Sequence, residues 1–174
     1  RTGTGVISLF GPSIEFDVSE RIPLLTTKKV NFNSILHETI WMFVKGDTNT
    51  KYLTDNNVKI WNEWANSQGD LGPIYGKQAR AFQGYREIFD DWSFYTEVDS
   101  VDQISDLIHN IKTNPYSRRH VITLWNPATS PIDKLSFEDN IEDGRSVLPV
   151  CHGALIQFYV DLQGRLSLIM HQRS

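Results

Sequence analysis

The sequence predicts an α+β (mixed α/β) fold: a single domain in which helices cover one large, mostly mixed β-sheet. Three observations support this prediction. Helix-type and strand-type segments alternate along the chain, no segment is repeated, and three segments rich in β-branched and aromatic residues lie in the last third. With 174 residues, the chain is long enough for one domain with a substantial core.

The N-terminal segments predict two short strands followed by a helix. The strands are residues 4–10 (TGVISLF) and 13–18 (SIEFDV), which a Gly-Pro turn separates. The helix runs from an N-cap at Asn33 to a terminating glycine at Gly46. Its predicted apolar face comprises Leu36, Ile40, Phe43 and Val44.

The second half of the chain predicts one clear helix and three strands. The helix runs from its cap Ser100 to Asn114, where Pro115 stops it, and its apolar stripe comprises Val101, Ile104, Leu107, Ile108 and Ile111. The acidic segment 136–146 has no such stripe, so we expect a solvated surface insertion. The predicted strands cover residues 120–125, 153–160 and 165–170.

The last two strands flank Asp161-Leu162-Gln163-Gly164, which predicts a hairpin. If its turn is centred near Gln163, paired residues have numbers that sum to about 326. Cys151, the only cysteine, then lies near Arg173, whose permanent positive charge favours the thiolate over the thiol. An activated nucleophile needs this environment. A buried structural cysteine is the alternative that the residues leave open.

Other chemistries of Cys151 fit the sequence less well. Its neighbour His152 argues against a Cys-His dyad, because adjacent side chains in extended chain point to opposite faces. A metal site needs several ligands at suitable spacing, whereas the five histidines are scattered and no second cysteine exists. We therefore expect no metal.

Composition argues against several classes of partner. The net charge of −4 provides no bulk attraction to nucleic acid or to an anionic membrane. No apolar run approaches the roughly 20 residues that span a bilayer. With one cysteine and no signal peptide, we expect a cytoplasmic protein. The chain begins at Arg1 without a methionine and stops just after a predicted strand, so we expect both ends to be truncated.

Two arginines next to each other point to an anion. Arg118 and Arg119 stand between a helix end and a strand, and guanidinium forks bind phosphate oxygens bidentately. Together with Arg1 and Arg173 they would form a strongly basic cluster, if the fold brings them together. Solvated surface charge is the alternative.

Aromatic and acidic residues in the first half suit a pocket for a flat heterocycle. Trp61 and Trp64 lie among polar residues, which favours a pocket wall over simple core filling. Tyr75 lies on a loop constrained by a proline and a glycine. Glu38 falls on or near the apolar face of its helix, where a carboxyl group is costly unless it has a partner or a task.

The segments RTGTG, PLLTTKK, HETIW…GDTN, NNVKIWNEWA, GDLGPIYGKQ, NPYSRRHVITLWNP, PVCH and QFYV…QRS occur in this order. Together they resemble the thymidylate synthase family over nearly the whole chain, and they match roughly the first two-thirds of that family's fold. The resemblance implies that residues 1–174 form a catalytic domain of a homodimer whose sheet makes the dimer contact. It also implies reductive methylation of dUMP to dTMP, with 5,10-methylenetetrahydrofolate as the donor of the one-carbon unit and of the hydride.

The resemblance also implies a role for each residue singled out above. Cys151 would add to uracil C6, Glu38 would organise water and proton transfer, and Tyr75 would assist removal of the C5 proton. Arg173 would support the thiolate and contact the phosphate. The implied dUMP ligands are Arg1, His152, Gln172, Arg173 and Ser174 of one subunit, with Arg118 and Arg119 of the other. The implied folate wall comprises Ile60, Trp61 and Trp64.

Two alternative functions stay open at this point. The family's residue that reads the pyrimidine would lie beyond Ser174, so a dUMP/dCMP hydroxymethylase on the same fold is possible, in which water replaces the hydride. A non-catalytic protein that binds RNA is the other, and the acidic charge and the retained Cys, Arg, Glu and Tyr set argue against it. Product analysis tests the first alternative, and the Cys151→Ser variant tests the second.

Overall fold

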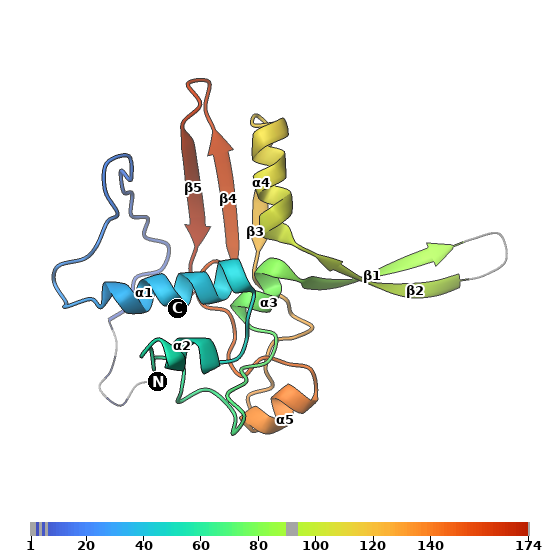
Figure 1. Ribbon diagram of the computed structural model, residues 1–174. Helices are drawn as coiled ribbons and strands as arrows, with labels where there is room; N and C mark the ends of the chain where they lie inside the picture. The colour runs from blue at the N-terminus through green and yellow to red at the C-terminus, as the bar shows by residue number, and fades with distance from the viewer. Residues whose placement is uncertain (1–2, 4, 6, 90–93, 174) are drawn as a thin grey trace. The chain divides into compact units, whose positions relative to one another are not determined.

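The computed structural model describes residues 3, 5, 7–89 and 94–173, and it confirms the α+β class (Figure 1). The chain divides into two compact units, Arg1–Phe32 and Asn33–Ser174. All the strands and nearly all the helical residues of the described chain belong to the second unit.

The first unit lacks the two strands that the sequence predicts. Within the described residues, neither 5 and 7–10 nor 13–18 has strand structure, so this prediction is wrong there. Large apolar side chains such as Ile7, Phe10 and Ile14 are exposed. A short extended segment is stable only when a neighbouring strand and an apolar face support it. The strand-like composition of these segments is therefore not enough to form strands.

The predicted helix forms, but its C-terminal part is a π-helix, which is wider than an α-helix. Helix α1 (Phe32–Thr39) continues directly into a π-helical stretch, η1 (Ile40–Lys45). Gly46 ends it as predicted, with φ of 62° and its N–H bonded to the Trp41 carbonyl. Asn33 lies inside the helix and is not its cap. These bounds place the last turns of the helix around Trp41.

The buried face of this helix also differs from the prediction. Phe43 packs against the core as predicted, but Leu36 and Val44 are exposed, and Trp41 and Met42 are buried instead. The expected stripe assumed the α-helical period, and the wider turns of the π-helix rotate the face that meets the core. The Trp41 indole N–H donates to the Asn49 carbonyl at 2.9 Å, which ties the helix to the following loop.

The core of the second unit gathers around two short helices, α2 (Lys51–Asp55) and α3 (Tyr75–Arg80). Its side chains are apolar and come from segments far apart in the sequence. They include Trp41, Leu53, Val58, Leu71, Ile74, Ala79, Ile122, Leu124, Val147 and Val150. The N-terminus of α3 is thereby anchored in the core, and α3 begins at Tyr75.

A β-hairpin precedes the long helix. Strands β1 (Phe82–Phe89) and β2 (Phe94–Val101) pair antiparallel, and helix α4 (Gln103–Thr113) follows. The predicted cap Ser100 and the predicted stripe residue Val101 therefore belong to β2. The N-cap is Asp102, whose side chain accepts the Ser105 N–H at 3.0 Å. The rest of the stripe is confirmed at Leu107, which is buried, and at Ile104 and Ile111, which pack on the core, but not at the exposed Ile108.

The C-terminal strands form the second sheet. Strands β3 (Val121–Thr123), β4 (Leu155–Val160) and β5 (Leu166–His171) pair antiparallel in the order β3-β4-β5, and Figure 1 shows α4 alongside β3. Leu155 pairs with His171 and Val160 with Leu166, so paired numbers add to 326 and the predicted hairpin register is confirmed.

The predicted single, mostly mixed sheet is not what the described residues form. They form two separate antiparallel sheets, one of two strands and one of three. Within the described residues, β1 and β2 pair only with each other. Strand patterns specify which segments can pair, but not which edges meet.

The acidic segment 136–146 is not simply a solvated insertion. It contains helix α5 (Phe137–Glu142), whose N-cap Ser136 accepts the Asp139 N–H. Phe137 and Ile141 pack against the core, and Asn140 is buried. Two apolar residues four apart suffice to dock one short turn, which is too short for a stripe to be recognised.

Candidate functional site

The sheet topology brings three distant side chains to one end of the β3-β4-β5 sheet. Thr123, Leu155 and His171 form one cross-strand row. Because both strand pairings are antiparallel, the residues that follow β3, those that precede β4 and those that follow β5 all lie on the same side of this row. Two residues past the row lie Trp125 and Arg173, and Cys151 lies four residues before it. The Arg173 N–H donates to the Cys151 carbonyl at 2.6 Å, which extends the strand pairing to the cysteine.

Cys151 is partly buried and lies against a guanidinium group. The Arg173 Nη2 is 3.9 Å from the Cys151 Sγ, and its Nε–H donates to the Val150 carbonyl at 3.3 Å. The thiol itself can donate to the Pro149 carbonyl at 3.6 Å. A fixed positive charge therefore lies beside the sulfur atom. The predicted proximity of Cys151 and Arg173 is therefore confirmed.

Tyr75 connects the cysteine to the core. Its hydroxyl oxygen accepts the Cys151 N–H at 3.0 Å, and its ring is 3% exposed. The ring stacks on His152, with centroids 5.2 Å apart and planes at 11°, and meets Trp61 edge-on at 6.0 Å. Burial raises the pKa of the Tyr75 phenol, and this effect outweighs the backbone N–H groups of Cys151 and His152, which lower it; charge on Cys151 and Glu38 adds to the increase. Tyr75 thus supplies a neutral phenol.

Glu38 lies at the other end of this chain of contacts. The Trp61 indole N–H donates to Glu38 Oε1 at 2.7 Å, and Glu38 is half-buried on α1. Trp61 also meets Trp41 at 5.8 Å. The carboxyl group therefore has a partner, as its costly position required. Contacts run continuously from Glu38 through Trp61 and Tyr75 to Cys151.

The three predicted folate-wall residues lie together in the loop between α2 and α3, with different exposures. Trp61 is 9% exposed, Trp64 is partly buried, and Ile60 is 49% exposed. Trp64 contacts Phe137 of α5, with ring centroids 6.3 Å apart. Exposed apolar surface on Ile60 beside half-buried indole fits a flat, partly apolar ligand.

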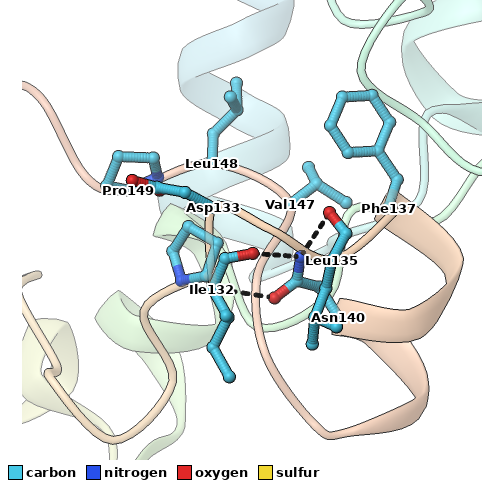
Figure 2. Close-up of a pocket in the computed structure, with 9 residues that line it drawn as sticks. Ile132, Asp133, Leu135, Phe137, Asn140, Val147, Leu148 and Pro149 are labelled. Carbon is cyan, nitrogen blue, oxygen red and sulfur yellow. Dashed lines mark hydrogen bonds between the residues drawn. The ribbon is translucent and has the colours of Figure 1, made fainter.

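Phe137 is also one of the residues that line a pocket of about 190 Å³ (Figure 2). Figure 2 shows Asn140 beside Ile132 and Leu135, whose carbonyls its amide group binds at 3.3 and 3.4 Å. The buried amide thus shapes the loop that forms one wall. The full lining is Pro131, Ile132, Asp133, Leu135, Phe137, Asn140, Val147, Leu148 and Pro149. Leu148 and Pro149 precede Val150 and Cys151 in the chain, so the pocket lies next to the segment that carries the thiol.

Among the described residues that are predicted to bind dUMP, Arg173 is the arginine that contacts Cys151. Arg118 and Arg119 are exposed on the loop between α4 and β3, where the Arg119 N–H bonds to Ser117 Oγ at 3.2 Å. Gln172 is exposed after β5. The predicted ligands Arg1 and Ser174 lie outside the described residues.

Sequence reasoning missed two residues of this region. Trp125 lies beneath the Arg173 guanidinium, whose carbon is 5.5 Å from the ring centroid. Extending the predicted register to the strand at 120–125 could have found it. His120, 1% exposed, bonds through Nε2 to the Pro115 carbonyl at 3.0 Å, and so stabilises the loop that carries the two arginines. Nothing in its local sequence indicates this burial.

Within the residues that the structure describes, no group of three or more His, Cys, Asp or Glu side chains could hold a metal ion. In the same part of the chain, no helix is both long enough and apolar enough to cross a membrane.

Comparison with known proteins shows the family of the chain. The family model described as thymidylate synthase matches residues 1–174. The chain belongs to the thymidylate synthase family. Similar relatives are the thymidylate synthase of Francisella philomiragia subsp. philomiragia, 47% identical over 174 residues, and that of Francisella tularensis subsp. holarctica, 48% identical over the same length. Each alignment covers 100% of this chain and 57% of the thymidylate synthase to which it aligns.

Proposed function

We propose that the complete protein converts dUMP to dTMP, with 5,10-methylenetetrahydrofolate as one-carbon and hydride donor. The observation that carries the proposal is the Arg173 guanidinium 3.9 Å from the Cys151 sulfur. Membership of the thymidylate synthase family supports it. The chain spans little more than half the length of the relatives that it matches.

In this proposal Cys151 is the nucleophile. Uracil C5 is a poor nucleophile until a group adds at C6. The Cys151 thiolate forms a bond to C6, and the electrons of the C5–C6 double bond move toward C5 and the O4 carbonyl. C5 can then attack an electrophilic carbon. Arg173 favours the reactive thiolate before this addition.

Tyr75, Glu38 and His152 handle protons around the pyrimidine. The raised pKa of Tyr75 keeps it a phenol, so it assists removal of the C5 proton by orienting water rather than by acting as a phenolate. Glu38, held by the Trp61 indole N–H, can accept or relay a proton from the same side. His152 stacks on Tyr75 and supports this network.

The phosphate is bound by arginines from two subunits. Arg173 offers guanidinium donors from one subunit, and Arg1 and Ser174 complete that half, while Gln172 lines the nucleotide pocket. Arg118 and Arg119 reach the partner's site, which accords with their exposure on a loop away from Cys151. The protein therefore acts as a homodimer in this proposal, with the sheet as the dimer contact. Exposed apolar side chains on β5, such as Leu168 and Met170, accord with a covered sheet face.

Ile60, Trp61 and Trp64 form the folate side of the site. When bound, the folate supplies the one-carbon unit and the hydride that reduces it. These residues hold the pterin against a largely apolar wall and exclude water from the reacting carbon. Exclusion of water is what separates a synthase from a hydroxymethylase. We propose a cytoplasmic location and assign no role to a metal.

The test uses the complete protein incubated with 5-fluoro-dUMP and 5,10-methylenetetrahydrofolate. We expect mass spectrometry to find a covalent adduct on the Cys151 peptide, and no adduct with Cys151→Ala. With dUMP, formation of dihydrofolate and dTMP is expected. A folded, dimeric protein without the adduct contradicts the proposal, and a hydroxymethylated product identifies the hydroxymethylase instead.

A further inference from the structure

The Arg173 side chain is held without a carboxylate. In the part of the chain that the structure describes, the ion pairs involve Lys51, Arg80, Arg145 and Arg165 with aspartates, and none involves Arg173. Its contacts are the Val150 carbonyl, the Cys151 sulfur and the face of Trp125. A carboxylate partner would offset the charge that acts on the sulfur, whereas an indole face does not.

Trp125 is fixed in the place where this contact requires it. Its neighbours Leu124 and Asn126 are 1% and 9% exposed, and the Leu124 N–H donates to the Ala154 carbonyl at 3.3 Å. The backbone is thus anchored on both sides of the tryptophan, which itself is 36% exposed. An anchored, rigid ring restricts the flexible arginine at little entropic cost of its own.

We propose that Trp125 is a positioning residue for Arg173. The indole face fixes the guanidinium plane so that Nη2 points to the Cys151 sulfur and Nε to the Val150 carbonyl. The remaining N–H donors of the guanidinium are then free for an anion. Trp125 thereby raises the reactivity of Cys151 although it lies against the arginine and not against the sulfur. The anion-binding role of Arg173 rests on the proposed function, and Trp125 would hold Arg173 in place for that role.

The test measures the reactivity of Cys151 without any substrate. The complete protein is alkylated with iodoacetamide at neutral pH, and the rate at the Cys151 peptide is followed by mass spectrometry. Loss of one partly exposed cation–π contact predicts that Trp125→Leu lowers this rate about 2- to 5-fold. Trp125→Phe keeps an aromatic face with a weaker quadrupole, so its alkylation rate is expected to lie between that of the parent and that of Trp125→Leu. Circular dichroism establishes that each variant is folded.

The matched control removes the arginine's charge. In an Arg173→Met background, Trp125→Leu is expected to leave the alkylation rate unchanged, because the tryptophan acts through the guanidinium. An equal loss in both backgrounds, or a parental rate in Trp125→Leu, overturns the proposal. If Trp125→Leu does not fold, Trp125→Phe decides, and a rate equal to the parent's contradicts the proposal. The 5-fluoro-dUMP adduct tests the proposed function separately, since alkylation needs no nucleotide.

Discussion

Replacement of Tyr75 by phenylalanine tests the contact that joins the cysteine to the core. The change removes one oxygen atom, which accepts the Cys151 N–H at 3.0 Å. The ring remains, with its stacking on His152 and its edge contact to Trp61. A buried N–H left without an acceptor costs about 1–3 kcal/mol. We therefore expect Tyr75→Phe to lower the free energy of unfolding by about 2 kcal/mol.

This magnitude can be measured as a shift in the melting temperature. For a chain of roughly 150–250 residues, about 2 kcal/mol corresponds to a decrease of roughly 4–8 °C, and a longer chain melts with a smaller decrease. Calorimetry of the complete protein is the assay. Tyr75→Leu also removes two aromatic contacts, so its decrease is expected to be larger. The control is Tyr116→Phe, because Tyr116 is 62% exposed and loses little when its hydroxyl is removed.

One result would refute this reasoning. If Tyr75→Phe melts within about 1 °C of the parent while Tyr75→Leu is strongly destabilised, packing of the ring stabilises the site and the hydroxyl does not. The Cys151 N–H would then have another partner, and the assignment of Tyr75 as the group that orients the cysteine would fail.

Three other predictions concern pH and backbone geometry. Burial raises the pKa of Tyr75 above its value in the unfolded chain. The stability that the buried, neutral phenol contributes is therefore retained below about pH 10 and lost as pH rises through the folded pKa. Urea unfolding at increasing pH should show this alkaline loss, and Tyr75→Phe should abolish it. Gly72→Ala should lower the free energy of unfolding by more than about 2 kcal/mol, because φ is 68° and the new Cβ would lie 2.2 Å from the Arg145 carbonyl oxygen. Gly164→Ala, at φ of 77°, meets open space and should lower it by about 1 kcal/mol. Chemical denaturation compares the two variants. The backbone N–H of Arg165 holds the pKa of Asp161 below its usual value. The stability that the Asp161 carboxylate gives the hairpin is therefore present above pH 3.8 and lost as pH falls through the folded pKa. Amide exchange in β4 and β5 should show this loss, and Asp161→Ala should remove its pH dependence.

Features set by near neighbours in the chain were predictable. The Asp161–Gly164 turn determines the β4-β5 register, because the length of a short loop decides which residues face each other. The stop at Gly46 follows from the left-handed conformation that glycine tolerates, and the α4 stripe follows from its period. The proximity of Cys151 and Arg173 was predictable for the same reason, since only the hairpin separates them.

Features that depend on distant segments were not predictable in this way. Residues 4–10 and 13–18 have strand-like composition, but the described part of them pairs with no strand. The short helix α5 docks through Phe137, whose partner Trp64 lies more than seventy residues earlier. The π-helical turns that bury Trp41 follow from packing against the core and not from the pattern of the helix itself.

The sequence by itself determined the class of the fold, the hairpin that sets arginine beside the cysteine, and, through its motifs, the thymidylate synthase resemblance. Only the tertiary structure decided how Tyr75, Trp61 and Glu38 connect to Cys151, and that Trp125 lies beneath Arg173. The physical reason is the range of the interactions. Turn geometry and helical period act over a few residues, whereas stacking and burial depend on which distant surfaces the whole chain brings into contact.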